Sequence, residues 1–188
     1  MSGYASAQHD RMIAGTIKAC YVVALDLTAS PPVCRVSDGE WTSAWVRWHS
    51  IAAGKARHWR APSMGEQGAL ISPSGDVGQG TFVPGLYGNA GAPPDNRDHV
   101  EVWRFDDGGS LVYDWTAKKY TITVPTGEVL VKVGASTLSV TDNAIAGDAA
   151  VISLKGAVNI DGPLHVTEDI TSDGSIIDAG GNSNHHTH

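Results

Sequence analysis

Three of the last four residues of the chain are histidines, namely His185, His186 and His188. One residue separates His186 from His188, so in an extended chain both imidazoles point to the same side while Thr187 points away. Two neutral imidazoles from one chain make a poor metal site. Three symmetry-related chains would supply six imidazole nitrogens, enough for an octahedral cage. The question is whether the preceding residues bring three C-termini to one point.

Several interpretations of these histidines are open. A purification tag is usually an uninterrupted run of histidines, whereas Thr187 interrupts this one. A polar, disordered tail is the common state of a C-terminus. A metalloenzyme would need an open coordination position. An octahedron of six imidazoles suits Fe(II), Co(II) or Ni(II) better than Zn(II), and a site saturated in this way would be structural rather than catalytic.

The composition favours an all-β protein that does not bind nucleic acid. The chain has 188 residues, 22 of them glycine, and a formal net charge of −7. Scattered Val, Ile and Thr between glycines favour strands and turns, and the acidic balance argues against a phosphate-rich partner. No apolar run is long enough for a transmembrane helix, and the N-terminus has no export signal. We therefore expect folding in a cytoplasm, with Cys20 and Cys34 as buried thiols, although they would pair if they lay opposite each other.

The residue types change sharply along the chain. Every tryptophan lies at or before Trp115, and every arginine at or before Arg104. This change predicts a boundary near residues 105–116. The first part has aromatic side chains for a globular core, whereas the second part has mainly small ones and must be thin.

The strand pattern also differs between the two parts. After an arm or short helix that Gly15 breaks, five short strands are expected at 16–27, 33–36, 42–48, 69–72 and 80–85, which is typical of a small closed barrel of the OB type. Two more strands are expected at 100–105 and 111–115. Short alternating runs then recur at intervals of roughly ten residues: 120–124, 129–133, 137–140, 150–154, 158–160, 164–167 and 175–177. Their small apolar faces would be buried if three chains wound around one axis as a β-helix or β-prism.

Several motifs, taken in order, resemble the baseplate assembly protein V family, the central membrane-piercing spike of contractile phage tails and R-type pyocins. The resemblance covers essentially the whole chain. The matching features are Ala53-Gly54, Trp59, Pro62-x-x-Gly65-Glu66-Gln67, Gly75-Asp76, Gly80-Thr81-Phe82-Val83, Gly108-Gly109-Ser110 leading to Tyr113-Asp114, and the closing residues 181–188.

The resemblance implies an OB-fold barrel attached to the tail hub, a trimeric β-helix below it, and a pointed tip. At the tip, His186 and His188 of three chains would hold one iron ion (Fe2+) per trimer, with His185 outside the first shell. Some members of the family also hold calcium and chloride on the axis, and those ligands do not map onto this sequence. The expected segments are an arm at 1–14, the barrel at 15–90, linker and neck strands at 91–115, the trimeric β-helix at 116–180 and the metal-binding apex at 181–188.

The resemblance further implies a non-enzymatic homotrimer at the baseplate tip of a virion or pyocin particle, with tail hub and baseplate proteins as partners and the bacterial outer membrane as its target. No pair of carboxylates is placed for acid–base work, and no nucleophile motif is present. An OB-fold module on a β-rich stalk that binds an oligonucleotide or glycan is the alternative. In that case Trp41, Trp45 and Trp48 would form a stacking face, whereas in a spike they would be barrel core or trimer contacts.

Overall fold

The computed structural model describes residues 2–175 and divides the chain into two compact units, residues 1–125 and 126–188. The first unit begins with helix α1 (Ser2–Thr16), which runs through Gly15 instead of stopping there. A Cβ atom at Gly15 would lie 2.6 Å from the carbonyl oxygen of Gly75, so the glycine allows close packing. The last turn of the helix is thereby held against the short 3-10 helix η1 (Pro73–Gly75), while His9 and its neighbours in the helix are exposed.

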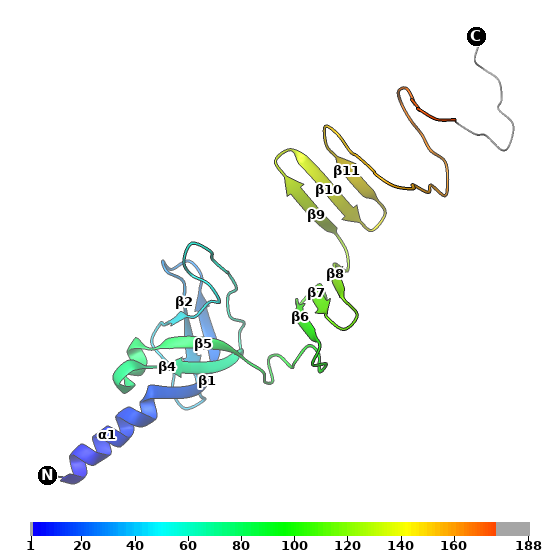
Figure 1. The fold of residues 1–188 in the computed structure, drawn as a ribbon. Coiled ribbons are helices and arrows are strands. Elements are labelled where there is room, and N and C mark those ends of the chain that lie inside the picture. Colours follow the sequence, from blue (N-terminus) through cyan, green and yellow to red (C-terminus); the bar gives the residue numbers. More distant parts are fainter. Residues whose placement is uncertain (1, 176–188) are drawn as a thin grey trace. The chain divides into compact units, whose positions relative to one another are not determined.

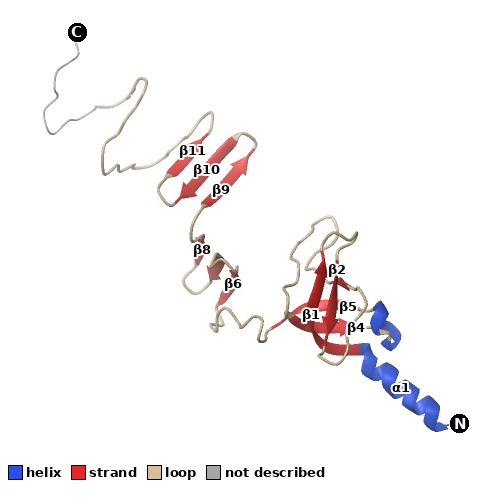
Figure 2. Cartoon of the chain, turned by 180° about the vertical axis from the view of Figure 1, so that it is seen from behind, coloured by secondary structure: helices blue, strands red, loops and turns tan. Residues whose placement is uncertain are grey.

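Five strands form a nearly closed barrel, as predicted (Figures 1 and 2). In chain order they are β1 (Ile17–Asp26), β2 (Val33–Ser37), β3 (Arg47–Trp48), β4 (Gln67–Ile71) and β5 (Thr81–Leu86). The sheet order is β2-β1-β4-β5-β3, and β3 runs parallel to β5 while the other neighbours are antiparallel. A bridge between Cys34 and Val46, with N–O distances of 2.8 and 2.9 Å, joins the two ends of the sheet.

The third barrel strand is much shorter than expected. The sequence predicts residues 42–48, whereas the structure has a strand only at Arg47–Trp48, with isolated bridges at Thr42 and Val46. This segment closes the barrel by pairing first with β2 and then with β5, so no single ladder continues along it.

The barrel encloses a small apolar core. The buried apolar residues are Cys20, Val22, Cys34, Val36, Val46, Leu70 and Phe82. Both cysteines are free thiols within this core, as predicted. Burial raises the pKa of the Cys34 thiol to about 11, which keeps it neutral over the ordinary range.

The long loop between β3 and β4 is held by hydrogen bonds to Glu66, just before β4 begins. Arg60 donates two hydrogen bonds to the carboxylate of Glu66, with N–O distances of 2.8 and 2.6 Å, and the amide of Ser63 donates a third at 2.8 Å. Bidentate pairing of this kind fixes orientation as well as distance. Burial raises the pKa of Glu66, but these hydrogen bonds outweigh it, so the net effect is a lowered pKa.

The first unit ends in an antiparallel three-stranded sheet of β6 (Val100–Arg104), β7 (Ser110–Asp114) and β8 (Lys119–Thr123). The second 3-10 helix, η2 (Val77–Gln79), precedes β5 in the barrel. The sequence predicts these strands at 100–105, 111–115 and 120–124, and each prediction lies within one residue of the observed bounds.

The second unit contains an antiparallel sheet of β9 (Glu128–Val133), β10 (Ser136–Thr141) and β11 (Ile145–Asp148). The sequence predicts β9 and β10 but not β11. From 149 to 175 the structure has no strand, so the strands expected at 150–154, 158–160 and 164–167 are not formed in one copy of the chain. A strand requires a partner for its backbone hydrogen bonds, and a single copy supplies none to these residues.

Barrel packing predicts different outcomes for two Gly→Ala variants. A Cβ at Gly68 would meet the carbonyl oxygen of Val83 and lie 2.7 Å from the ring of Phe82, whereas a Cβ at Gly54 meets nothing within 4 Å. We expect Gly68→Ala to destabilise the barrel by about 1–3 kcal/mol, since overpacking forces backbone shifts. Gly54→Ala should leave stability nearly unchanged. Urea unfolding followed by tryptophan fluorescence tests this, and equal midpoints for the two variants would contradict it.

The Arg60–Glu66 pair predicts that the stability of the barrel decreases in acid. The pKa of Glu66 is lower in the folded state than in the unfolded state, where it is about 4.3. The contribution of Glu66 to stability is therefore present above the unfolded pKa and is lost as the pH falls through the folded pKa. Glu66→Gln should therefore be less stable than the wild type at neutral pH, and the gap should shrink below about pH 4. Urea unfolding across this range measures the gap, with the exposed Glu40→Gln as control. A gap that does not change with pH would refute the assignment.

Candidate assembly surface

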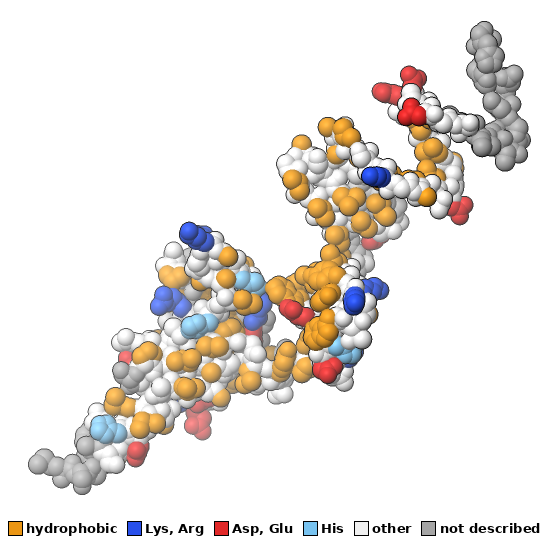
Figure 3. Space-filling view, in the orientation of Figure 1, with side chains coloured by type: hydrophobic (Ala, Val, Ile, Leu, Met, Phe, Trp, Pro, Cys, Tyr) orange, Lys and Arg blue, Asp and Glu red, His pale blue; other side chains and the backbone are white. Residues whose placement is uncertain are grey.

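The strands after the barrel have apolar side chains but no core. Among residues 6–175, every apolar side chain described as buried lies between Cys20 and Phe82. From Trp103 to Ile170, the exposed large apolar side chains retain 41–78% of their accessible surface. Figure 3 shows apolar side chains at the surface of both three-stranded sheets. Monomeric soluble proteins rarely expose apolar surface on this scale, so it marks a contact surface.

One face of the β9-β10-β11 sheet is apolar. Register pairs Val131 with Leu138, and Val140 with both Val129 and Ile145. Paired residues point to the same side of a sheet, so these side chains share a face. The opposite face is mostly polar, with the rows Lys132–Thr137–Asp148 and Leu130–Ser139–Ala146. This sheet is therefore built to be covered on one side.

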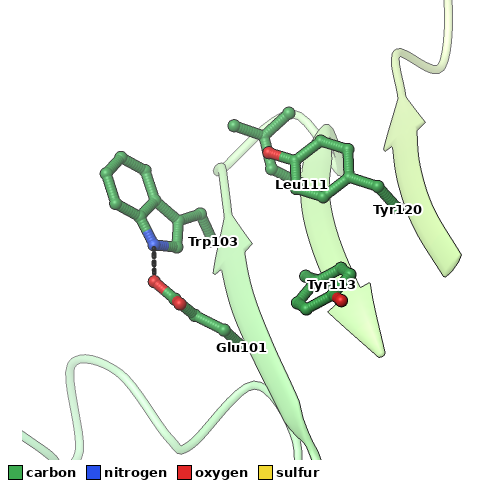
Figure 4. A pocket seen from close by; sticks show the side chains of 5 residues that line it. All are labelled: Glu101, Trp103, Leu111, Tyr113 and Tyr120. Atoms are coloured by element: carbon green, nitrogen blue, oxygen red, sulfur yellow. Dashed lines mark hydrogen bonds between the residues drawn. The ribbon is translucent and has the colours of Figure 1, made fainter. Parts of the chain in front are cut away.

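The β6-β7-β8 sheet also has an apolar face, and this one is aromatic. Its register gives two rows across the three strands, Glu101–Tyr113–Tyr120 and Trp103–Leu111–Ile122. The Trp103, Tyr113 and Tyr120 side chains are 44%, 42% and 57% exposed. Figure 4 shows five of these side chains around a shallow hollow, with the indole N–H of Trp103 donating to the Glu101 carboxylate at 3.1 Å.

An ionic clamp fixes the chain where it enters this sheet. The Arg97 guanidinium binds Asp95 at 2.7 Å and Asp114, the last residue of β7, at 3.4 Å. The pKa of Asp114 is lowered, first by the hydrogen bond from the Ala117 amide and further by the nearby positive charge of Arg97. The amide of Trp115 also donates to the carbonyl of His99. These contacts tie the linker to the end of β7.

The predicted metal ligands, His186 and His188, lie outside the described residues. Within the described part of the chain, no group of three or more His, Cys, Asp or Glu residues is placed to hold a metal ion. His49 lies 3.0 Å from the Thr81 hydroxyl, and His99 lies 3.0 Å from the Asp98 carboxylate. His165 is exposed.

The tryptophan cluster of the barrel is divided between core and surface. Trp41 and Trp48 pack against the core, while Trp45 is 43% exposed. The Lys18 ammonium lies 4.7 Å from the Trp41 ring centroid, and the Arg35 guanidinium lies 4.8 Å from that of Trp45. One face of the Trp41 ring and one face of the Trp45 ring are thus already occupied by a cation of the same barrel. Of the three rings only Trp45 is exposed, so the cluster offers one open ring and not three.

Sequence reasoning missed the aromatic face and the Arg97 clamp. The alternation of residues 100–105 predicts a strand, but it does not show that Glu101 shares a face with Tyr113 and Tyr120. The one available signal was the retention of large aromatic residues up to Tyr120, in a region otherwise rich in small side chains.

Comparison with known proteins agrees with this division of the chain. Residues 18–87 match the family described as Type VI secretion system/phage-baseplate injector OB domain. Residues 101–172 match the family described as Gp138, beta helical trimerization domain. The chain is also 29% identical over 152 residues to the Spike protein of Escherichia phage P2, an alignment that covers 80% of this chain and 66% of that protein.

The barrel therefore belongs to the phage-baseplate injector OB-domain family, and the strands after it belong to a β-helical trimerization family. Over 152 of its residues the chain is a homologue of the phage P2 Spike protein, of whose length it spans slightly less than two thirds. In the described residues no helix has both the length and the apolar character needed to cross a lipid bilayer.

Proposed function

We propose that this chain is the spike protein of a contractile-tail baseplate, assembled as a homotrimer and without enzymatic activity. The observation that carries the proposal is the apolar surface between Trp103 and Ile170, which has no core beneath it in one copy. The match of this region to a trimerization family and the similarity to a phage Spike protein support it. In the trimer, three copies provide for one another the core that each lacks.

Residues 149–175 support the same assembly. They carry the alternating apolar residues Val151, Leu154, Val158, Ile160 and Leu164, all 55–77% exposed, and they form no strand in one copy. Adjacent copies would provide both the missing backbone partners and the apolar contacts. Pairing between chains around a closed ring leaves no open strand edge, which also protects the spike against aggregation.

A trimer of this kind is suited to a mechanical task. Interlocked strands distribute an axial load over many backbone hydrogen bonds and resist buckling, because no copy can unwind without breaking contacts with the other two. The barrel would attach the spike to the tail hub, and the Arg97 clamp would hold the linker firmly at the junction. Contraction of the tail sheath would drive the tip through the outer membrane of the target bacterium.

The proposal includes one iron ion at the tip, bound by His186 and His188 of three copies. The donor set supports it, since two neutral imidazoles per chain on one side of an extended segment give six nitrogens in a trimer. A closed, six-coordinate ion would act structurally and hold three chain ends at one point. Axial calcium or chloride remains part of the proposal without assigned ligands.

The trimer is tested by two adjacent residues on opposite faces of β10. Leu138 lies on the apolar face and Thr137 on the polar face. We expect wild type to sediment as a trimer, Leu138→Asp to weaken or abolish it because a carboxylate would enter an apolar contact, and Thr137→Asp to remain trimeric. Both variants introduce aspartate into the same strand, so the low strand propensity of aspartate affects both variants alike. A stable wild-type monomer in analytical ultracentrifugation would overturn the proposed function.

The tip is tested separately. The double variant His186→Ala, His188→Ala should lose its iron in elemental analysis while it remains a trimer, because the strands and not the metal hold the copies together. His165→Ala is the matched control and should keep one iron per trimer. Equal iron in the double variant and the wild type would refute these ligands without touching the trimer.

A further inference from the structure

We infer that the barrel binds an acidic surface of the tail hub protein through its basic loop, which is residues 49–60 of the segment between β3 and β4. The inference rests on the proposed function, in which the barrel attaches the spike to the hub. It adds the surface and the chemistry of that attachment. It concerns the barrel and another protein of the baseplate, and no contact between copies of this chain.

Positive charge gathers on this side of the barrel without matching negative charge. Residues 41–65 carry four of the 13 Lys and Arg residues of the chain and none of its 20 Asp and Glu residues, although the formal net charge of the chain is −7. Among the residues that the structure describes, no carboxylate pairs with Arg47, Lys55 or Arg57, and all three are exposed. Figure 3 shows Lys and Arg side chains over the loops of the barrel. Cations left unpaired in this way suit a partner that supplies carboxylates.

The tip of the basic loop is ordered although it packs against nothing. It is a small hairpin, closed by two backbone hydrogen bonds of 3.0 and 2.9 Å and by a bridge between Ala53 and Arg57. A Cβ atom at Gly54 would meet nothing within 4 Å, so the tip lies in open space. A loop that is ordered before it binds loses little conformational entropy on binding. The hairpin therefore presents Lys55 and Arg57 to a partner in fixed positions.

Exposed apolar side chains lie in the same loop as these cations. Ile51 is 81% exposed, and Trp59 is 64% exposed although its ring lies 5.7 Å from that of Trp48. Tryptophan and arginine are enriched in protein interfaces and supply much of the binding energy there. The basic loop thus combines an apolar contact area with charges that select the partner.

An acidic protein surface is the occupant that these observations favour. A protein that binds DNA through its phosphates makes about six to ten such contacts, each with a cation. The basic loop offers only Lys55 and Arg57 unpaired, since Arg60 is bound to Glu66. The match to the phage-baseplate injector OB domain covers residues 18–87 and so includes the whole loop. Neighbours in a baseplate are proteins, and nucleic acid is therefore an outcome of the test.

Acetylation of lysines in intact tails, read by mass spectrometry, tests the inference on the assembled particle. Lys55 should lose most of its reactivity in tails relative to the isolated trimer, whereas Lys119, exposed on β8, should react alike in both. A carbodiimide, which joins an amine directly to a carboxylate, should link Lys55 to an Asp or Glu of the hub protein. Equal reactivity of Lys55 in tails and trimer would overturn the inference. Protection that nuclease treatment removes would overturn it in favour of nucleic acid.

Charge-reversal variants give an independent test, with the purified hub protein of the same tail as the probe. Lys55→Glu and Arg57→Glu should each weaken its binding to the trimer by about tenfold at about 0.05 M NaCl, and by much less at about 0.5 M, because salt screens exposed charges. Arg11→Glu makes the same change at an exposed arginine of α1 and should bind as the wild type does.

The outcomes separate this inference from the proposed function. Loop variants that bind the hub as tightly as the wild type would refute the inference, and so would an equal loss in Arg11→Glu or a wild-type trimer that does not bind the hub. In each of these cases a trimer in analytical ultracentrifugation leaves the proposed assembly standing. A monomeric wild type would instead remove the proposed function.

Discussion

Apolar surface that one copy cannot bury is the constraint on which this molecule depends. The barrel satisfies the constraint by itself, because β1, β2, β4 and β5 curl around Leu70 and Phe82. The two three-stranded sheets do not, because each is a single layer whose large apolar side chains stay exposed in one copy. A single antiparallel layer gains little stability in water until its apolar face is covered. The proposed trimer follows from this difference and not from any particular side chain.

The two sheets meet the constraint with different side chains. The β6-β7-β8 sheet has large aromatic groups, which would fill a wider space between the copies of the proposed trimer. The β9-β10-β11 sheet and the residues after it have valine, leucine and isoleucine, which suit closer approach. The loss of large aromatic residues after Tyr120 would then reflect a narrower space between the copies of the proposed trimer.

The polar contacts of the first unit have a complementary role. The Arg60–Glu66 pair fixes the base of a long barrel loop, and Arg97 fixes the linker to the end of β7. Both guanidiniums are about half exposed, at 50% and 46%, so each ion pair adds little free energy. Their value is geometric, since each holds an otherwise irregular segment in one position. In the proposed spike, such fixed junctions would matter more than additional stability.

Much of this architecture is already determined by the sequence. Alternation locates β1, β2, β4, β5 and the strands from β6 to β10 to within a few residues, because an alternating apolar pattern is a local property. The sequence also shows that the second half lacks Phe, Trp and Tyr after Tyr120. It predicts that His186 and His188, which lie outside the described residues, would share one side if the chain there is extended. It misses β11, because Ile145-Ala146-Gly147-Asp148 has little alternation and ends in residues typical of turns. Tertiary structure decided the rest: the truncation of the third barrel strand, the absence of strands from 149 to 175 in one copy, and the row that joins Glu101 to Tyr113 and Tyr120. Each of these depends on which strand lies beside which and in what register, and the local pattern of side chains does not contain that information.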